Sequence, residues 1–481
     1  MTEITKSITY LKEYKRLKQA LEQGKTPVLA VGLSAIHKAH LAAALGLDTG
    51  RPVLVLTDDD AAAVRFSADL HAFAEKEVLT LPARELVMAD VTGVSRGYEQ
   101  RRLAALEALP RMRFAVASVQ AAAQRTLPPE ALAASVVTLS AGGTAPLEEL
   151  TQKLVHAGYE RCIQVEGTGQ FSVRGGILDV FPPQAAHPYR IEFWDDEIDS
   201  IASFDVGSQR RLENTETLRC LPCMETLPHL AAGGAKGLAK AVHGLLSTRK
   251  KKHADLAAHI ERDAERLEET GTLPAADKYL PLVYPKAATA LDYLPADALV
   301  LIEDTPRLRD AARDFHSRIA DDVTALLERG EMPPGLEGYA LDFAGLCRLP
   351  QPIVRLDSFL NNVPELAPAH LENFAANQMN AYGGNLDMAA ADIRGYTQQG
   401  RAVAVVCDSA LRCRNMPACT RRSAICCRAA GRVPCWKVHC PRGLSIPISV
   451  WSSSRRDRCW RAAKRCSRKN PAVTVSSPIP I

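Results

Sequence analysis

The stretch SVRGGILDVFPPQAAHPYRIEFWDDEIDSI, residues 172–201, predicts a short antiparallel β unit. Within it, the segment YRIEFW at residues 189–194 has an apolar side chain at every second position. Arg190, Glu192 and Trp194 then share the opposite face, as expected for a half-buried strand. We therefore expect one face of this unit to pack inward and the other to carry arginine and tryptophan.

Two dipeptides set the limits of the expected strands. Asp195-Asp196 suits a tight turn, and a further strand is expected directly after it at residues 197–204. Gly175-Gly176 is interpreted as a bulge in the strand that precedes Pro182-Pro183.

The exposed residues Arg174, Arg190 and Trp194 admit two interpretations on pattern alone. An exposed strand face carries polar groups in any protein, so the three could be ordinary surface residues. Arginine and tryptophan are also the residue types most enriched at binding hot spots. The pattern leaves both interpretations open.

The chain as a whole has 481 residues, which suggests roughly three or four domains. Its hydrophobic content of 47% supports packed cores. The first 25 residues are rich in charge and lack an apolar signal core, and no uninterrupted apolar run reaches the length of about 18 residues needed to span a membrane. We expect a soluble, cytoplasmic protein with no membrane partner.

Charge and cysteine are distributed unevenly along the chain. Residues 408–481 contain 13 Arg and 3 Lys against 2 Asp, whereas the rest contains 43 basic and 53 acidic residues. Nine of the 13 cysteines lie at positions 407–466, but no pair there has the two-residue gap of structural zinc sites, and His439 is the one histidine. The segment also lacks helical or alternating periodicity. We interpret residues 408–481 as an out-of-frame or disordered basic tail, with a frame change between about residues 405 and 418.

Before this tail, the pattern predicts an α/β protein. Residues 1–131 alternate buried strands such as PVLAVG, RPVLVL and FAVAS with helices, the first of which has Tyr10, Tyr14, Leu17 and Leu21 on one face. Short strands around one helix follow at 132–222. Helices and the buried strand DALVLIED occupy 223–351, and the helix NLDMAAADIRGYTQQG and the strand AVAVVC fall in a third region at 352–407.

The first strand-to-helix turn aligns with a phosphate loop but lacks essential parts of it. Gly32 and Lys38 match the pattern G-x-x-x-x-G-K-[ST]. His37 replaces the glycine that lets the backbone wrap phosphate, and Ala39 replaces the hydroxyl that would hold magnesium. We interpret this turn as a degenerate phosphate loop and expect no ATP or magnesium cofactor.

Three further motifs are assigned structural roles. Glu303-Asp304 ends a buried strand as carboxylates commonly do, and Cys220-x-x-Cys223 follows a strand rather than opening a helix. The basic run STRKKKH at residues 247–253 is interpreted as a solvated helix face. No residue is assigned as catalytic or as a metal ligand.

Three segments in succession, VRGGILDVFPP, YRIEFWDDEIDSI and FDVGSQR, closely resemble the second domain of the transcription-repair coupling factors, which is shared with the excision-repair protein UvrB. The resemblance covers about residues 10–407 and includes LTLPAREL, TLPAADKYLPLVY and YLPADALVLIED. Coupling factor is preferred over UvrB because the phosphate loop is degraded and PARELVMADVTGVSRGYEQ has no aromatic cluster to clamp DNA.

This resemblance implies a fold and a partner. A parallel-sheet, phosphate-loop-like domain (1–131 and 223–351) would be split by an inserted α+β domain (132–222) and followed by an incomplete small α/β domain (352–407). The inserted domain of the family binds UvrA, and the positions that match its contact residues are Arg174, Arg190 and Trp194.

RNA polymerase, duplex DNA and ATP are implied only for the full-length family, whose motor domains we expect to be absent here. Two alternatives stay open. One is a divergent UvrB-like nucleotide-binding repair protein. The other is a nucleic-acid-binding protein acting through its basic tail, with salt-dependent DNA affinity.

Overall fold

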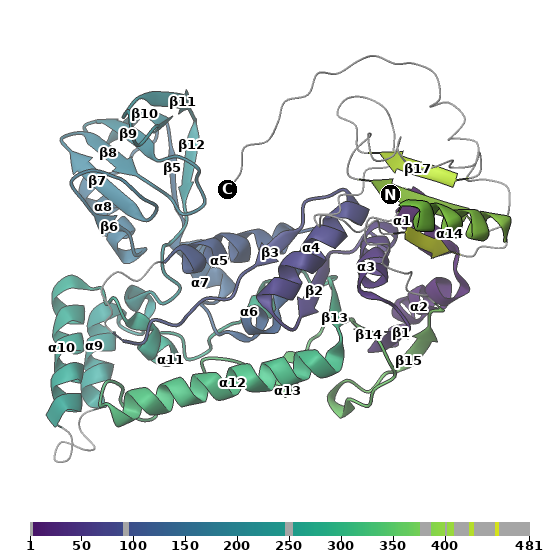
Figure 1. Ribbon diagram of the computed structural model, residues 1–481. Helices are drawn as coiled ribbons and strands as arrows, with labels where there is room; N and C mark the ends of the chain where they lie inside the picture. Colours follow the sequence, from purple (N-terminus) through teal and green to yellow (C-terminus); the bar gives the residue numbers. More distant parts are fainter. Residues whose placement is uncertain are drawn as a thin grey trace.

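The structure is a computed structural model that describes residues 3–89, 96–245, 254–375 and 386–399, together with strands at 402–407, 423–427 and 448–451. Figure 1 shows the main elements in space, with a β domain set apart from a larger α/β body. In the described part of the chain, no helix combines the length and the apolar character that crossing a membrane requires.

The larger body is built on a parallel sheet in the order β15-β1-β14-β13-β2-β4-β3. Its strands are β1 (Val28–Val31), β2 (Val53–Thr57), β3 (Leu79–Leu81), β4 (Phe114–Ser118), β13 (Leu299–Glu303), β14 (Ile353–Asp357) and β15 (His370–Asn373). Every pairing between neighbours in this sheet is parallel. The continuous apolar runs of the central strands are buried on both faces, as the sequence pattern predicted.

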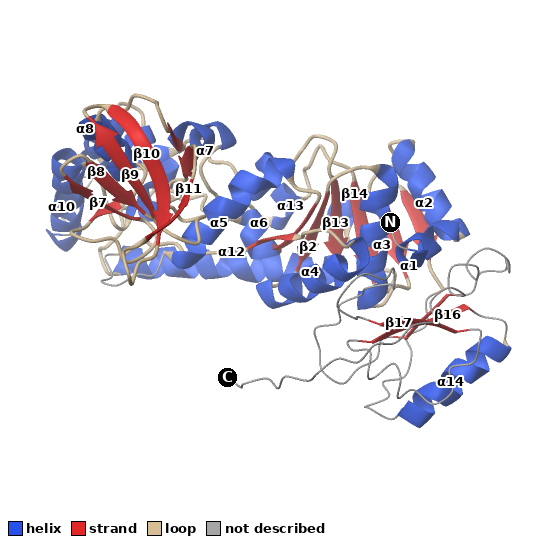
Figure 2. Cartoon of the chain, turned by 90° about the horizontal axis from the view of Figure 1, so that it is seen from above, coloured by secondary structure: helices blue, strands red, loops and turns tan. Residues whose placement is uncertain are grey.

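Alternate residues of each strand enter two different cores. Val53 and Val55 of β2 pack with α2 (Lys12–Glu22), α3 (Ala35–Thr49) and α4 (Asp60–Ala74). Leu54 and Leu56 pack on the other side with α5 (Gly97–Ala108), α6 (Val119–Ala123) and α12 (Thr305–Glu328). The prediction of an α/β fold is confirmed, with helices on both faces of the sheet (Figure 2).

One detail of the first helix differs from its prediction. The helix α2 begins at Lys12, so Tyr14, Leu17 and Leu21 lie on its buried face. Tyr10 ends a separate 3-10 turn and its side chain is half exposed. The extended backbone of Leu11 interrupts the helix, so Tyr10 does not belong to the buried face.

The inserted domain is a six-stranded sheet in the order β11-β10-β9-β8-β7-β6 with one helix, α8 (Leu147–His156), packed on it. The strands are β6 (Glu160–Arg161), β7 (Gln170–Arg174), β8 (Ile177–Val180), β9 (Tyr189–Trp194), β10 (Glu197–Phe204) and β11 (Arg211–Asn214). The chain enters through β5 (Val137–Ser140) and leaves through β12 (Thr217–Cys220), which pair antiparallel. This pairing brings entry and exit side by side, as an inserted domain requires.

Helices connect the inserted domain back to the parallel sheet. In Figure 1, α9 (Gly234–Gly244) and α10 (Ala254–Thr270) lie side by side, and the long helix α12 runs from them toward the sheet. The pattern of residues 254–270 predicts a helix with Leu256, Ile260, Ala264 and Leu267 on one face. In the structure Ile260, Ala264 and Leu267 are buried and Leu256 is partly buried. The remaining short elements are α1 (Glu3–Ser7), α7 (Pro129–Ser135), α11 (Leu280–Val283), α13 (Phe343–Leu346), η1 (Ile8–Tyr10), η2 (Leu109–Arg111), η3 (Pro228–Leu230), η4 (Ala276–Tyr279), η5 (Ala290–Tyr293) and η6 (Pro364–Leu366).

The predicted domain boundary at residue 352 is wrong. The strand β14 lies between β1 and β13 in the parallel sheet, and β15 forms its edge, so both complete the first domain. The pattern did not predict β14, because Arg355 and Asp357 interrupt the apolar run that is typical of a central parallel strand. In the structure Arg355 and Asp357 are fully buried and pair with each other, with 2.6 Å between Nη2 and Oδ2.

Beyond this sheet, the predicted helix and strand are present as α14 (Leu386–Gln398) and β16 (Ala402–Cys407). Within the tail, the described segments β17 (Ser423–Cys427) and β18 (Ile448–Trp451) flank β16, the first parallel and the second antiparallel. The expectation of disorder does not hold for these nine residues. The rest of residues 408–481 and the basic run at 247–253 lie outside the described residues.

Candidate functional site

Two of the predicted contact residues meet on a third residue that the sequence analysis did not single out. Arg190 of β9 pairs directly with Asp179 of β8, and Arg174 ends the neighbouring strand β7. Nη2 of Arg174 donates to Oδ2 of Asp179 at 2.6 Å. Arg190 donates from Nε to Oδ1 at 2.7 Å and from Nη2 to Oδ2 at 2.9 Å. The carboxylate therefore joins the two guanidinium groups across three strands.

Asp179 is almost inaccessible, since its side chain is 2% exposed, against 24% for Arg190 and 51% for Arg174. Arg190 also donates to Oε1 of Gln209 at 3.1 Å and lies over the ring of Phe204. The hydrogen bonds to Asp179 raise the pKa of Arg190 above its usual value. Arg174 is thus open to solvent as expected, whereas Arg190 presents one edge only.

Trp194 is the most exposed of the three predicted residues, at 82%. It ends β9 and is followed by the turn Asp195-Asp196, which was predicted correctly; Asp195 takes the left-handed conformation at φ 56°. An exposed tryptophan leaves a large apolar surface in water, where it contributes no burial free energy to folding. Its position at the end of β9 leaves that surface available to a partner.

The interpretation of Gly175-Gly176 as a bulge is wrong. Arg174 pairs with Ile177, so the two glycines form the two-residue turn of a hairpin, with Gly175 at φ 59°. The amide of Phe193 donates to the carbonyl of Gly176 at 2.8 Å. The β7–β8 turn therefore lies beside the end of β9, next to Trp194.

The degenerate phosphate loop is a short structural turn. The helix α3 already begins at Ala35, so His37, Lys38 and Ala39 are helical and buried. Gly32 has φ 78°, and a Cβ there would lie 2.2 Å from the carbonyl oxygen of Phe374. Glycine is required at this position because the chain after β15 approaches closely.

Lys38 is buried and lies beside a carboxylate of the protein itself. Its Nζ lies 3.8 Å from Oε1 of Glu303, at the end of β13. Burial raises the pKa of Glu303 and lowers that of His37, whose Nδ1 is 2.8 Å from Oγ of Ser34. The lysine that would reach a phosphate is thus directed to an internal carboxylate.

The C-x-x-C pair also has a structural setting. Cys220 and Cys223 are buried free thiols, and burial raises the pKa of Cys220 to about 12. Such thiols are poor nucleophiles. Among the described residues, no group of three or more His, Cys, Asp and Glu side chains is arranged to hold a metal ion.

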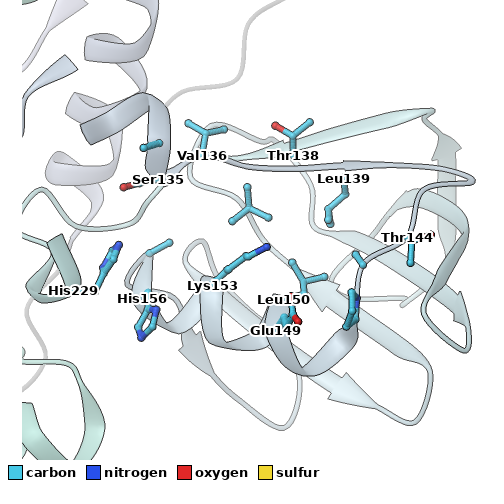
Figure 3. Close-up of a pocket in the computed structure, with 15 residues that line it drawn as sticks. Ser135, Val136, Thr138, Leu139, Thr144, Glu149, Leu150, Lys153, His156 and His229 are labelled. Atoms are coloured by element: carbon cyan, nitrogen blue, oxygen red, sulfur yellow. The ribbon is translucent and has the colours of Figure 1, made fainter. Parts of the chain in front are cut away.

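A cavity of about 490 Å³ lies between α8 and residues 134–139, with His229 at one end (Figure 3). The ring of His229 stacks on that of His156, with 5.0 Å between centroids, and burial lowers the pKa of His229 to about 4. Arg174, Arg190 and Trp194 do not line this cavity. The predicted contact residues lie instead on the open face of the six-stranded sheet.

A buried charged cluster anchors the exit of the inserted domain on the first. Nε of Arg84 lies 2.9 Å from Oε1 of Glu225, and Nη1 lies 2.5 Å from Oδ2 of Asp277. Nε of Arg102 lies 3.1 Å from the same oxygen of Glu225, and Thr226 donates to Asp277. Arg84 belongs to the segment LTLPAREL, but its partners are distant in the sequence, so no local pattern predicts this cluster.

Comparison with known proteins places these features in a family context. A family described as "UvrB interaction domain" matches residues 137–225, from the start of β5 to just beyond β12. A transcription-repair-coupling factor of Bacillus subtilis (strain 168) is 29% identical over 409 residues, which are 82% of this chain and 34% of the relative. One from Escherichia coli (strain K12) is 30% identical over 289 residues, 59% of this chain and 24% of the relative.

A third such factor, from Staphylococcus aureus (strain MRSA252), is 24% identical over 439 residues, covering 87% of this chain and 36% of the relative. The chain thus spans about a third or less of the length of the curated relatives it matches. These similarities confirm the resemblance to the N-terminal region of the coupling factors.

Proposed function

We propose that this chain, a relative of the N-terminal region of the transcription-repair-coupling factors, recruits UvrA to sites of transcription-coupled DNA repair. The observation that carries the proposal is the joint presentation of Arg174, Arg190 and Trp194 on the outer face of the inserted sheet. Arginine and tryptophan side chains dominate the binding energy of many protein interfaces. An open sheet face fits a protein partner better than a small substrate, which usually binds in a concave site.

The role proposed for the first domain is to support this face rather than to hydrolyse ATP. Its phosphate-loop equivalent has become a helical turn with Lys38 paired to Glu303. A phosphate would find neither a glycine-lined backbone nest nor a hydroxyl for magnesium there. Contacts with RNA polymerase and ATP-driven movement on duplex DNA are assigned to the full-length family.

Competition with UvrB tests this function. Since the matched domain is shared with UvrB, the two proteins should occupy the same surface of UvrA. A fluorescently labelled chain should bind UvrA saturably, and excess unlabelled UvrB should release it. The same result is expected for a control variant, Glu148→Ala/Gln152→Ala, which changes exposed residues of α8 on the opposite face of the sheet. Absence of binding, or a ternary complex with UvrB, would contradict the proposal.

A further inference from the structure

We propose that Asp179 is a positioning residue, which holds Arg174 and Arg190 as one preformed unit for an acidic side chain of UvrA. The proposal rests on the UvrA-binding function proposed above. Asp179 is not among the residues matched to the family's contacts, and at 2% exposure it can reach UvrA only through the arginines.

The central position of Asp179 comes from strand order. Its strand β8 lies between β7 and β9, and the side chain accepts from both neighbours at 2.6, 2.7 and 2.9 Å. A buried carboxylate is costly unless it is paired and hydrogen-bonded, and here both oxygens are used. The site is therefore a rigid unit in which the anion fixes the two cations.

The donors left over define the chemistry of the partner. Among the described residues, Nη1 of Arg190 and both Nε and Nη1 of Arg174 make no hydrogen bond, so their N–H groups remain available. Two arginines and one aspartate carry a net charge of +1. A glutamate or aspartate of UvrA next to an apolar area for Trp194 would complete this surface, with charge-assisted bonds to the arginines.

Preorganisation explains why a carboxylate would be useful in a site that binds acid. Long side chains lose rotamer freedom when they bind, and side chains already held in place lose less. A simpler view makes the opposite prediction. If Asp179 only competed for the arginine charge, then its neutralisation would strengthen the complex.

The test is a double-mutant cycle on the full chain with UvrA titrated in. Asp179→Asn keeps the shape of the side chain and removes its charge. We expect about tenfold weaker binding in the wild-type background and less than a twofold change in the background Arg174→Ala/Arg190→Ala. A purely structural role would weaken both backgrounds alike. Asp199→Asn removes an exposed carboxylate of β10 and should change affinity less than twofold.

If Asp179→Asn also lowers the melting temperature, a second variant, Arg190→Lys, tests the same role by its affinity for UvrA. Arg190→Lys retains the charge but loses the bidentate fork that matches the carboxylate. It should lose nearly as much affinity as Arg190→Ala if positioning matters, and almost none if charge alone matters.

Unchanged or tighter binding by Asp179→Asn would overturn the positioning role, and so would equal losses in both backgrounds. Failure of the underlying function looks different. In that case the wild-type chain does not bind UvrA, or Arg174→Ala/Arg190→Ala binds as well as wild type, and both proposals fall.

Discussion

Asp277 and Asp179 are both buried carboxylates held by arginine, but they differ in consequence. Asp179 lies under an open sheet face, whereas Asp277 is buried within the first domain and accepts from Arg84, Thr226 and the amide of Val87. Burial would raise the pKa of Asp277, but the guanidinium of Arg84 outweighs this and keeps it below the usual value. The carboxylate therefore remains charged and holds the cluster together.

Replacing Asp277 should be costly. Asp277→Asn removes one of the three carboxylates around the buried Arg84 and leaves Glu225 at 2.9 Å and Glu99 at 3.8 Å. Because a buried positive charge then lacks part of its compensation, we expect the free energy of unfolding to fall by about 3 kcal/mol. Denaturant unfolding measures this, with Asp310→Asn on the exposed face of α12 as the control. A loss within about 0.5 kcal/mol of the control would show that the cluster does not stabilise the chain.

His40 should make stability depend on pH. Burial lowers its pKa from 6.5 to about 4 in the folded state. As the pH falls below 6.5, the unfolded chain takes up a proton first, so stability is complete above pH 6.5 and declines toward pH 4. The loss for this group is about 3 kcal/mol at the lower end. Between pH 7 and pH 5, the free energy of unfolding should fall less for His40→Gln than for the wild-type chain. The same pH dependence in both proteins would contradict the lowered pKa of His40.

At the scale of elements, one of two short turns in the inserted domain could be predicted from local sequence and the other could not. Asp195-Asp196 was predictable because two turn-forming residues separate two alternating runs. Gly175-Gly176 was compatible with either a bulge or a turn, and only the pairing of Arg174 with Ile177 decides between them. Asp179 was overlooked for a similar reason, since it lies in the mostly apolar run ILDV and its partners come from two other strands.

The β1–α3 turn carries a prediction about nucleotide. Neither the wild-type chain nor Lys38→Ala should bind magnesium-ATP in a calorimetric titration, because the residues of the former loop are helical. Lys38→Ala should instead lower the free energy of unfolding by about 1–3 kcal/mol, since Glu303 loses its buried partner. Micromolar, magnesium-dependent ATP binding that disappears in Lys38→Ala would favour the UvrB-like alternative.

At the scale of the whole molecule, sequence patterns predicted the parallel sheet and the family resemblance implied the inserted domain, but neither predicted where the first domain ends. The pairing of β1 with β14 joins Val28 to Val354, and β15 lies beyond β1 at the sheet edge. Such contacts are not encoded by local periodicity. The charges of Arg355 and Asp357 further disguised β14, because each is acceptable in the core only when paired with the other.

This topology predicts different behaviour for two fragments. A fragment of residues 1–351 ends at the predicted boundary and lacks β14, so β1 and β13 would lose the strand between them. A fragment of residues 1–375 keeps all seven strands. Only the longer fragment should show a cooperative thermal transition for the α/β body by circular dichroism. Equal transitions in both would mean that β14 and β15 are dispensable.

The contact between UvrA and the outer face of the inserted sheet is tested most directly by measuring UvrA affinity for three single variants, Arg174→Ala, Arg190→Ala and Trp194→Ala, with melting curves for each. We predict losses of about 2 kcal/mol or more, roughly thirtyfold in affinity, with little change in melting temperature for Arg174→Ala and Trp194→Ala, whose side chains are exposed. The control variants Glu148→Ala and Gln152→Ala, at exposed positions of α8 on the opposite face of the sheet, should stay within about 0.5 kcal/mol of wild type. Wild-type affinity in all three variants would contradict the proposed UvrA contact.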